Sequence, residues 1–223
     1  FALNPASVPH DADLIVIGNP TNPTGALHPA QMLRRLVAPG RLLVVDEAFM
    51  DSTDGAQSLI GPAMDGVLVL RSLTKTYGLA GIRAGYAVGA ADLITRLASQ
   101  QQPWAVSTPA AAAMIACCGD EADQLRSRLA AELPALRQDL ASRLRRLGLR
   151  VIDSAAPFLL VDTASIGPES VREPLARLGF AVRRGETFPG LGPTWIRLAV
   201  RDVGTHERLT DALSTLINAK ENR

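Results

Sequence analysis

The side chains best suited to chemistry gather around Lys75, which follows an apolar stretch and precedes a glycine-spaced turn ending at Arg83. An amine held at the end of a strand is suited to forming a Schiff base with a carbonyl compound. Ser72 and Thr74 add two hydroxyls and Arg83 adds a guanidinium, and these groups bind phosphate monoesters. Pyridoxal phosphate (PLP) carries both an aldehyde and a phosphate, so the run predicts a lysine-anchored PLP site. Taken alone, a Ser-x-x-Lys run is more typical of a surface lysine after a strand.

Two further segments place polar groups directly after apolar runs. Residues 14–18 are followed by the turn 19–25, in which two Asn-Pro pairs and a glycine predict a rigid, non-helical loop. Residues 42–45 form another continuous apolar run, typical of a buried parallel strand, and end at Asp46 and Glu47. Acids at the carboxyl ends of parallel strands lie where open α/β sheets bind ligands. Each feature also has a plain structural reading, as a connecting turn or a helix cap.

The three motifs, in this order, resemble those of the class I and II aminotransferases, the fold-type-I PLP enzymes. The matching segments are Asn19 to Gly25, Val44 to Phe49, and Ser72-x-Thr74-Lys75 with Arg83 eight residues later. The resemblance covers essentially the whole chain. The strings 46–51 and 70–75 are most similar to the histidinol-phosphate aminotransferase branch. Within it they are nearest to threonine-phosphate decarboxylase and related enzymes of cobalamin biosynthesis.

This resemblance implies a role for each polar residue of the motifs. Lys75 would form the Schiff base and then act as the general base that moves the proton of the substrate Cα. Asp46 would pair with the pyridine nitrogen, and Asn22 would donate to the cofactor O3′ beside the substrate. The phosphate would be held by Ser72, Thr74 and Arg83. The chain departs from the usual pattern at Phe49, where most aminotransferases have a tyrosine whose hydroxyl also contacts O3′. Phenylalanine at this position resembles the residue found in the cobalamin-pathway relatives.

Arginines near the end of the chain are candidates for binding an anionic substrate. The run Trp195 to Arg201 alternates as a strand would, which predicts Arg197 and Arg201 on one face. By resemblance, Arg197 clamps the α-carboxylate of the substrate. Arg201 is a second anion contact or an exposed strand arginine, and both readings stay open. Arg183 and Arg184 are weaker candidates, because a basic pair in a loop is usually solvated.

Composition limits the function classes. The net charge is +1 and aromatic residues make up 4%, with Lys and Arg scattered, so no nucleic-acid partner is expected. The chain lacks an apolar run of the ~18 residues that a membrane span needs, and no signal peptide is evident, so we expect a soluble, cytoplasmic protein. Cys117 and Cys118 are expected to be small core residues. The three histidines show no ligand spacing, and no metal is expected: His10, His28 and His206.

The elements that must position these residues predict an α/β fold in two parts. Residues 1–120 would form part of a PLP-transferase large domain, with a mostly parallel sheet flanked by helices on both faces. Residues 121–223 would supply an interdomain helix and a small α+β domain that carries Arg197. The helix is expected over 121–147, with Pro134 kinking or dividing it. Further helices are expected at 29–37, 92–101, 109–118, 169–178 and 205–218, and strands near 151, 158–161, 180–183 and 195–200.

The resemblance also implies contributions from outside this sequence. A family member has a long segment before the position of Phe1, which supplies a phosphate cup, an aromatic that stacks on the ring, and contacts to the partner in a homodimer. This chain is therefore expected to hold PLP weakly by itself. Two function classes stay open. One is a PLP-dependent aminotransferase or decarboxylase acting on a small amino acid, with or without a phosphate; the other is a catalytically silent fragment that needs an N-terminal half.

Overall fold

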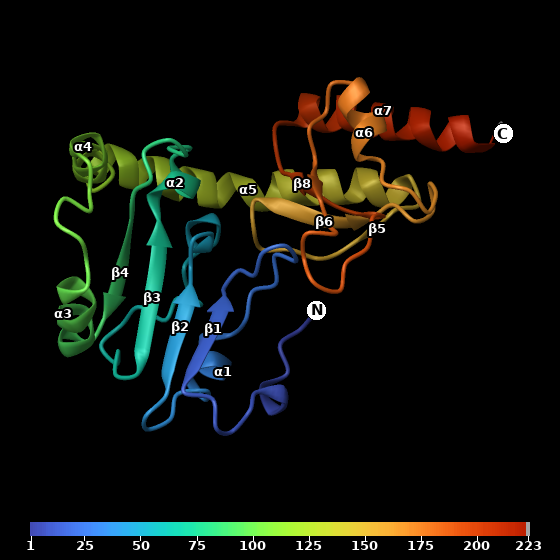
Figure 1. Ribbon diagram of the computed structural model, residues 1–223. Coiled ribbons are helices and arrows are strands. Elements are labelled where there is room, and N and C mark those ends of the chain that lie inside the picture. The colour runs from blue at the N-terminus through green and yellow to red at the C-terminus, as the bar shows by residue number, and fades with distance from the viewer. Residues whose placement is uncertain (222–223) are drawn as a thin grey trace. The chain divides into compact units, whose positions relative to one another are not determined.

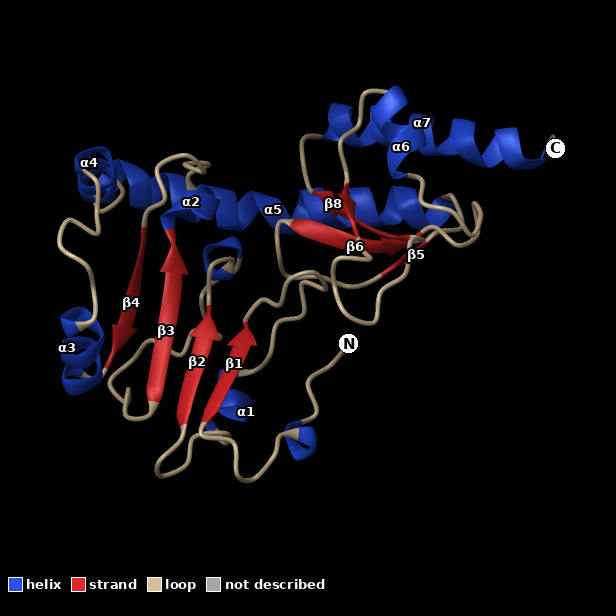
Figure 2. Ribbon diagram, viewed as in Figure 1, coloured by secondary structure: helices blue, strands red, loops and turns tan. Residues whose placement is uncertain are grey.

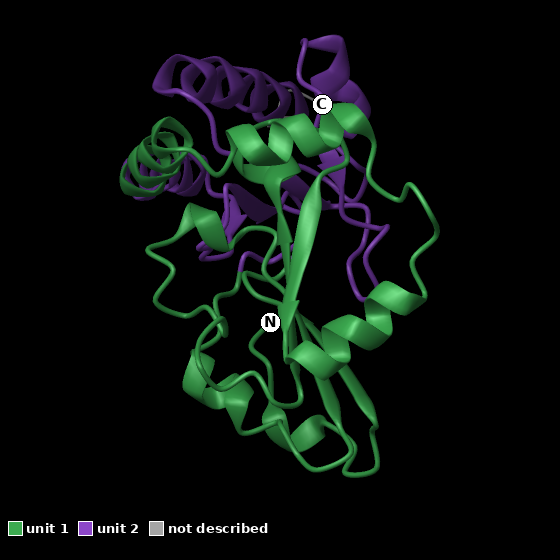
Figure 3. Ribbon diagram, turned by 90° about the vertical axis from the view of Figure 1, so that its left-hand side faces the viewer, with its two compact units in different colours: residues 1–21, 26–131 green, residues 22–25, 132–223 purple. Residues whose placement is uncertain are grey.

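The computed structural model describes residues 1–221, which divide into two compact units. Unit 1 comprises Phe1–Thr21 and Ala26–Ala131, and unit 2 comprises Asn22–Gly25 and Glu132–Arg223 (Figure 3). The Asn-Pro turn of the first motif is therefore shared between the two units. The long helix α5 (Asp120–Arg146) begins in unit 1 and ends in unit 2.

Unit 1 is built on a four-stranded sheet in the order β1-β2-β3-β4 (Figure 1). Its strands are β1 (Leu14–Gly18), β2 (Leu42–Asp46), β3 (Val67–Ser72) and β4 (Gly85–Gly89). The first three strands are parallel, and β4 runs antiparallel to β3. The expected mostly parallel sheet is confirmed, and the carboxyl ends of β1, β2 and β3 meet at one edge.

One face of this sheet is covered. Ile15, Leu43 and Val69 are buried there against Leu33 of α1 (Ala30–Arg34) and Leu36, which follows that helix. On the opposite face, Leu14 and Val16 are 56% and 64% exposed among the described residues. On that second face Leu68 of β3 is nevertheless buried, and Ile94 of the helix after β4 lies near it beside Gly89. Cover on the second face is therefore found near β3 and β4, while β1 is left exposed.

Four helices of unit 1 begin and end within one to three residues of the expected positions: α1, α3 (Ala91–Ser99), α4 (Thr108–Ala116) and α5, which continues into unit 2. The short helix α2 (Leu73–Thr76) and the 3-10 turns η1 (Pro5–Ser7) and η2 (Met50–Ser52) were not expected. Ser107 caps α4, since its hydroxyl accepts from Ala110 N at 3.2 Å. Figure 2 separates these helices from the strands.

Pro134 does not divide α5, which is continuous over 27 residues. The missing amide of a proline costs one helical hydrogen bond, and other interactions of this helix offset it. Its first turn holds Asp120, Glu121 and Asp123 and its last turn holds three arginines, which suits the helix dipole at both ends. Its final turns also bury Leu140 and Leu144 in the core of unit 2.

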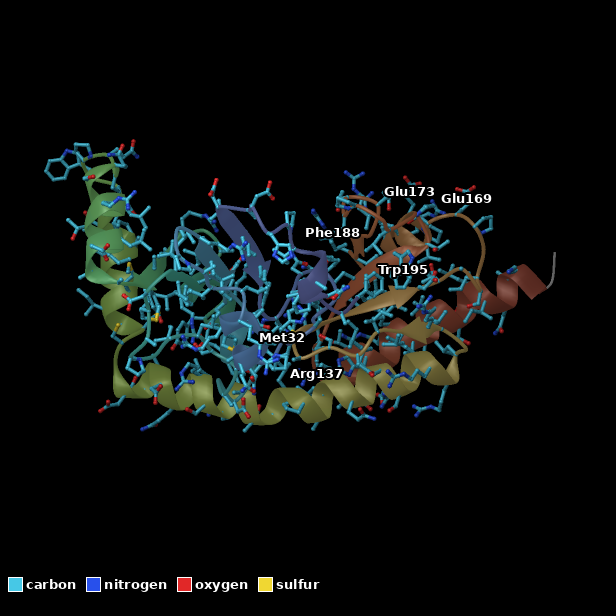
Figure 4. All side chains as sticks on the ribbon, turned by 90° about the horizontal axis from the view of Figure 1, so that it is seen from below. Met32, Arg137, Glu169, Glu173, Phe188 and Trp195 are labelled. Atoms are coloured by element: carbon cyan, nitrogen blue, oxygen red, sulfur yellow. The ribbon has the colours of Figure 1, made fainter. Side chains whose placement is uncertain are left out.

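Unit 2 contains a second, antiparallel sheet in the order β5-β6-β8-β7. Its elements are β5 (Arg150–Val151), β6 (Phe158–Asp162), α6 (Arg172–Arg177), β7 (Arg183–Arg184), β8 (Trp195–Ala199) and α7 (Val203–Glu221). Figure 4 labels Trp195 on β8, Phe188 on the loop before it, and Glu173 on α6. The strand expected over 180–183 is short and begins at Arg183, and the last strand ends two residues before Arg201. None of the described helices has the length and apolar character needed to cross a bilayer.

Candidate active site

Lys75 and Asp46 lie at the carboxyl ends of neighbouring parallel strands in unit 1. Asp46 is the last residue of β2 and pairs in register with Leu70 of β3, and Lys75 lies in α2, which follows β3 directly. Both side chains are exposed at the edge where ligands bind to open α/β sheets. Asp46 Oδ1 accepts from Ala48 N at 3.0 Å, which orients the carboxylate. Lys75 Nζ lies 5.8 Å from the centroid of the Phe49 ring.

The three residues expected to hold a phosphate belong to the same part of unit 1. The hydroxyl oxygens of Ser72 and Thr74 are 2.7 Å apart, so the two side chains form a pair. Ser72 occupies the N-cap position of α2 but makes no capping hydrogen bond, and its hydroxyl faces Thr74 instead. Arg83 has a φ of 59°, a left-handed conformation that is uncommon for arginine, and its Nη1 donates to Ala80 O at 3.0 Å.

The acidic pair after β2 separates into two roles. Asp46 is exposed, whereas Glu47 is 1% exposed, and Glu47 accepts from Ser58 Oγ and Leu59 N at 2.7 Å each. The alternation of a strand end places consecutive side chains on opposite faces, which accounts for the difference. Glu47 is thus bonded within the fold while Asp46 faces outward.

The two asparagines of the Asn-Pro turn also separate. Asn19 is fully buried, and its side chain exchanges hydrogen bonds with the backbone of His28 at 3.1 and 2.7 Å. Burial lowers the pKa of His28. Both Asn-Pro bonds, at Pro20 and Pro23, are cis. Asn19 therefore holds the turn to unit 1 by local bonds, while Asn22 is exposed within unit 2.

Gly25 explains why the turn ends in glycine. Its φ is 72°, and a Cβ built on it would lie 1.9 Å from Ser154 Oγ. The close approach is fixed by a hydrogen bond from Ala155 N to Gly25 O at 2.8 Å, inside unit 2. Any side chain at this position would displace the turn that carries Asn22.

Asn22 and Arg197 are brought together in unit 2. Arg197 Nη1 donates to Asn22 Oδ1 at 2.5 Å, and the guanidinium lies 4.6 Å from the centroid of the Phe158 ring. Burial lowers the pKa of Arg197, and the positive charge of Arg183 adds to the effect, although a guanidinium stays protonated in proteins. Because the Asn22 oxygen accepts from Arg197, its amide nitrogen is the group oriented to donate to a ligand.

Arg183, which sequence reasoning ranked low, is the arginine beside Arg197. The two residues pair directly across β7 and β8, so their side chains share one face of the sheet. Arg183 also lies 5.9 Å from the Phe188 ring centroid. The signal lay in the Gly/Pro-rich loop 185–193, which returns the chain as a hairpin and sets the arginines on either side of it in register.

Arg201 lies beyond the last residue of β8, so the argument from strand alternation does not apply to it. Its backbone N donates to His206 Nε2 at 2.9 Å, and its side chain is exposed. Its role as an anion contact stays a prediction without the expected strand geometry. The alternation failed because the chain leaves the sheet at Val200 to begin the turn into α7.

The two adjacent cysteines differ. Cys117 packs beside a small cluster of Leu73, Ala84 and Ala110, and burial raises the pKa of its thiol. Cys118 is exposed, which corrects the expectation that both are core residues. In the described part of the chain, no three His, Cys, Asp or Glu side chains are grouped so as to hold a metal ion.

Comparisons with known proteins identify the family and the fold. Residues 2–216 match the family model of aminotransferase class I and II. A histidinol-phosphate aminotransferase of Mycobacterium bovis is 48% identical over 202 residues, which are 90% of this chain and 55% of the relative. The crystal structure of the histidinol-phosphate aminotransferase from Clostridium acetobutylicum has a TM-score of 0.84 at 26% identity, covering 93% of this chain and 64% of that one.

A second solved structure is the histidinol-phosphate aminotransferase from Sinorhizobium meliloti in complex with pyridoxal-5'-phosphate. Its TM-score is 0.76 at 26% identity, and the match covers 94% of this chain and 58% of that one. The chain thus spans between about half and two thirds of the proteins that it matches. Since the family model covers nearly all of the sequence and the strand-end residues occupy the arrangement described above, the chain belongs to the class I and II aminotransferases.

Proposed function

We propose that this chain carries the lysine and the anion-binding residues of a PLP-dependent aminotransferase that acts on a small amino acid or amine bearing a phosphate. The observation that carries the proposal is the placement of Lys75 and Asp46 on adjacent parallel strand ends, beside the paired hydroxyls of Ser72 and Thr74. The chain spans 55% of its M. bovis relative, so the proposal concerns the activity of the whole protein.

The residues of unit 1 fit PLP by the chemistry of their donor groups. When bound, PLP supplies an aldehyde for covalent attachment and a ring that accepts electrons from a substrate carbon. Asp46 is an exposed, oriented carboxylate, suited to holding a proton on the ring nitrogen. The Ser72 and Thr74 hydroxyls and the Arg83 guanidinium are suited to holding three phosphate oxygens.

Lys75 would serve as the group that takes and returns the substrate Cα proton. Its side chain is exposed at the strand edge, which leaves it free to reach a bound substrate. Phe49 beside its amine has no hydroxyl, so hydrogen bonding to the ring oxygen O3′ would fall to the Asn22 amide. Arg197 keeps that amide oriented through its bond to the Asn22 oxygen.

Arg197 and Arg183 support a substrate with anionic groups. Two guanidiniums on one sheet face repel each other, and a bound anion relieves the repulsion. Arg197 would take a carboxylate as a bidentate fork, and Arg183 would take a second anion such as a phosphate. The names of the relatives, which are histidinol-phosphate aminotransferases, support the phosphate of this substrate class, whereas a carboxylate for Arg197 would come from an amino acid, since histidinol phosphate has none.

Phe49 favours a second candidate, a threonine-phosphate decarboxylase or related enzyme of cobalamin biosynthesis. The two reactions use the same cofactor-binding residues and differ in which bond of the substrate Cα is broken. Release of CO₂ from L-threonine O-3-phosphate would support the decarboxylase. Transfer of the amino group of histidinol phosphate to 2-oxoglutarate would support the aminotransferase.

The proposal is tested by adding PLP, reducing with borohydride and mapping the pyridoxyl adduct by peptide mass spectrometry. The sequence contains two lysines, Lys75 and Lys220, so Lys220 is an internal control. Lys220 Nζ donates to Ser165 O at 2.9 Å on the surface of unit 2. We expect the adduct on Lys75 and its loss in Lys75→Ala. Equal labelling of both lysines, or labelling of Lys220 alone, would contradict the proposal and favour a chain that is silent by itself.

A further inference from the structure

A buried ion-pair cluster lies behind the strand ends that carry Asp46 and Lys75. Glu47 has a fully buried carboxylate, and Arg71, near the end of β3, places its Nε 3.1 Å from Glu47 Oε2. That contact is an ion pair without hydrogen-bond geometry, since Arg71 Nε is the one buried side-chain donor of the described residues that lacks a hydrogen-bond partner. The orientation of the guanidinium is set instead by the hydrogen bonds of its two terminal nitrogens.

Those terminal nitrogens connect the strand end to a neighbouring turn. Arg71 Nη1 donates to Asp51 Oδ1 at 2.7 Å, and Nη2 donates to Ser58 Oγ at 3.2 Å. The other carboxylate oxygen of Asp51 accepts from Thr76 Oγ1 at 2.7 Å. Glu47, Asp51, Arg71 and Thr76 thus form a continuous set of contacts from β2 through β3 and η2 to α2, which we term the strand-end brace.

The helix that carries Lys75 depends on such outside contacts. α2 is four residues long, and a single helical turn is not stable by itself because nucleation is unfavourable. Its N-cap residue, Ser72, does not cap it. The burial of Leu73 anchors the start of α2. Its end is held by the Thr76 hydroxyl, which donates to Asp51, and by the Tyr77 hydroxyl, which donates to Ala122 O at 3.2 Å.

Thr76 is next to Lys75 in sequence, so the hydrogen bond from Thr76 to Asp51 fixes the helical turn that contains Lys75. Asp51 is itself fixed by Arg71, whose side chain is 12% exposed, while that of Asp51 is 22% exposed. The brace also includes Glu47, the residue immediately after Asp46. The placement of the lysine and of the outward carboxylate is therefore set by one connected group of side chains.

We propose that Asp51 and Thr76 are positioning residues that hold Lys75 in the orientation needed for covalent attachment of PLP. This inference rests on the proposed function. In this inference the strand-end brace sets the direction of the Lys75 amine, whereas Ser72, Thr74 and Arg83 bind the phosphate. An error of about 1 Å in such placement can cost roughly 100-fold in rate.

The test compares Thr76→Val, which keeps the shape but removes the hydroxyl, with Thr76→Ser, which restores a hydroxyl. The rate of labelling is measured with PLP and borohydride: Lys75 Nζ condenses with the aldehyde with loss of water, and hydride reduces the resulting C=N bond. Binding of pyridoxine 5′-phosphate, which lacks the aldehyde, is measured in parallel. We expect Thr76→Val to slow Lys75 labelling roughly 10-fold or more with unchanged pyridoxine phosphate affinity, and Thr76→Ser to recover most of the rate.

Thr95→Val is the matched control, because the Thr95 hydroxyl donates to Ala91 O at 2.8 Å on the exposed face of α3. It should change neither labelling nor affinity. In the loaded enzyme, kcat should fall in Thr76→Val while KM stays unchanged. Labelling of Thr76→Val at the wild-type rate, or failure of Thr76→Ser to restore it, would overturn the inference. If wild-type Lys75 is not labelled at all, the proposed function itself fails, which is a different outcome.

Discussion

At the scale of single residues, Arg83 combines backbone strain with a suitable charge. A non-glycine residue in the left-handed region costs of order 1 kcal/mol or more and persists where the surroundings require it. Glycine adopts this conformation without a Cβ penalty. The guanidinium is exposed and makes one hydrogen bond, to Ala80 O, so the fold gains little from the arginine side chain itself.

We therefore expect Arg83→Gly to leave stability unchanged or raise it by up to about 1 kcal/mol, while weakening phosphate binding. Loss of a charged hydrogen-bond donor costs about 1.5–3 kcal/mol, or roughly 10- to 150-fold in affinity. Melting temperature and pyridoxine 5′-phosphate binding are the two measurements. Arg83→Lys is the comparison, because it keeps both the charge and the strain. Wild-type affinity in Arg83→Gly would remove Arg83 from the phosphate site.

We expect Arg183 and Arg201 to differ in their effect on the binding of an anionic substrate. Arg183 shares a sheet face with Arg197, whereas Arg201 lies after the strand. We expect Arg183→Gln to raise KM about 10-fold or more for a phosphorylated substrate, and to change it less for an analogue without the phosphate. Arg201→Gln is the matched control and should leave both KM values near wild type. The reverse result would restore Arg201 as the second anion contact.

At the scale of elements, a buried histidine connects α5 to α7 and to the turn after β8. His206 is 1% exposed, its Nδ1 lies 2.8 Å from Asp139 Oδ2, and its Nε2 accepts from Arg201 N. Accepting at Nε2 assigns the ring proton to Nδ1, which donates to Asp139. Arg143 donates to the same carboxylate at 2.9 Å. Burial acts to raise the pKa of Asp139, but the hydrogen bonds from His206 and Arg143 outweigh it and hold that pKa below its usual range.

A carboxyl group whose pKa is lowered by folding stabilises the folded state at pH values above its ordinary pKa of 3.8. That contribution is lost as the pH falls through the lower pKa of the folded state. We expect Asp139→Ala to cost about 1–3 kcal/mol at pH 7, because it leaves the His206 Nδ1 proton buried without an acceptor. Below pH 4 the difference from wild type should shrink. Urea unfolding from pH 2.5 to 7, followed by Trp195 fluorescence in a Trp104→Phe background, measures this within unit 2.

Asp153→Ala is the control for that prediction. Asp153 pairs with Arg145 at 2.6 Å, but its side chain is 95% exposed. Exposed ion pairs contribute about 0–1 kcal/mol, so a small effect is expected. If Asp139→Ala and Asp153→Ala lowered the free energy of unfolding by similar amounts, the burial of His206 would not determine the strength of its bond to Asp139.

The elements that carry the site could be predicted because their signals are local. The apolar runs before Asp46 and Ser72 each end where the strand ends, and the Asn-Pro turn follows β1 directly. The pairing of Arg183 with Arg197 could not be predicted in this way, because strand register depends on where a hairpin turns. The burial of Glu47 could not be predicted either, since its partners are distant in sequence, at residues 58, 59 and 71. The expected division of the helix at Pro134 was wrong, because packing along α5 outweighs one missing hydrogen bond.

At the scale of the whole molecule, each unit has its own hydrophobic core. One core is built around Leu43 and Val69 in unit 1, and the other around Leu159 and Val161 of β6 together with Leu144 and Leu213 in unit 2. The covered face of the unit 1 sheet supplies its core, and the opposite face exposes apolar side chains of β1. Adjacent residues of a single strand therefore have different consequences: those on the covered face stabilise the core, and those on the other face leave apolar surface exposed, from which we predict self-association.

Ile15 and Val16 separate these two properties, because they are 7% and 64% exposed on neighbouring positions of β1. Ile15→Ala removes buried methyl groups from the core of unit 1 and should cost about 2–5 kcal/mol, measured by denaturant unfolding. Val16→Lys should change stability by less than about 0.5 kcal/mol. The same lysine adds charge to an exposed apolar face, so sedimentation velocity over a concentration series should show less self-association than in wild type. A large stability loss in Val16→Lys would instead mean that this face is covered in the folded protein in solution, because only a buried position penalises a charged side chain to that extent.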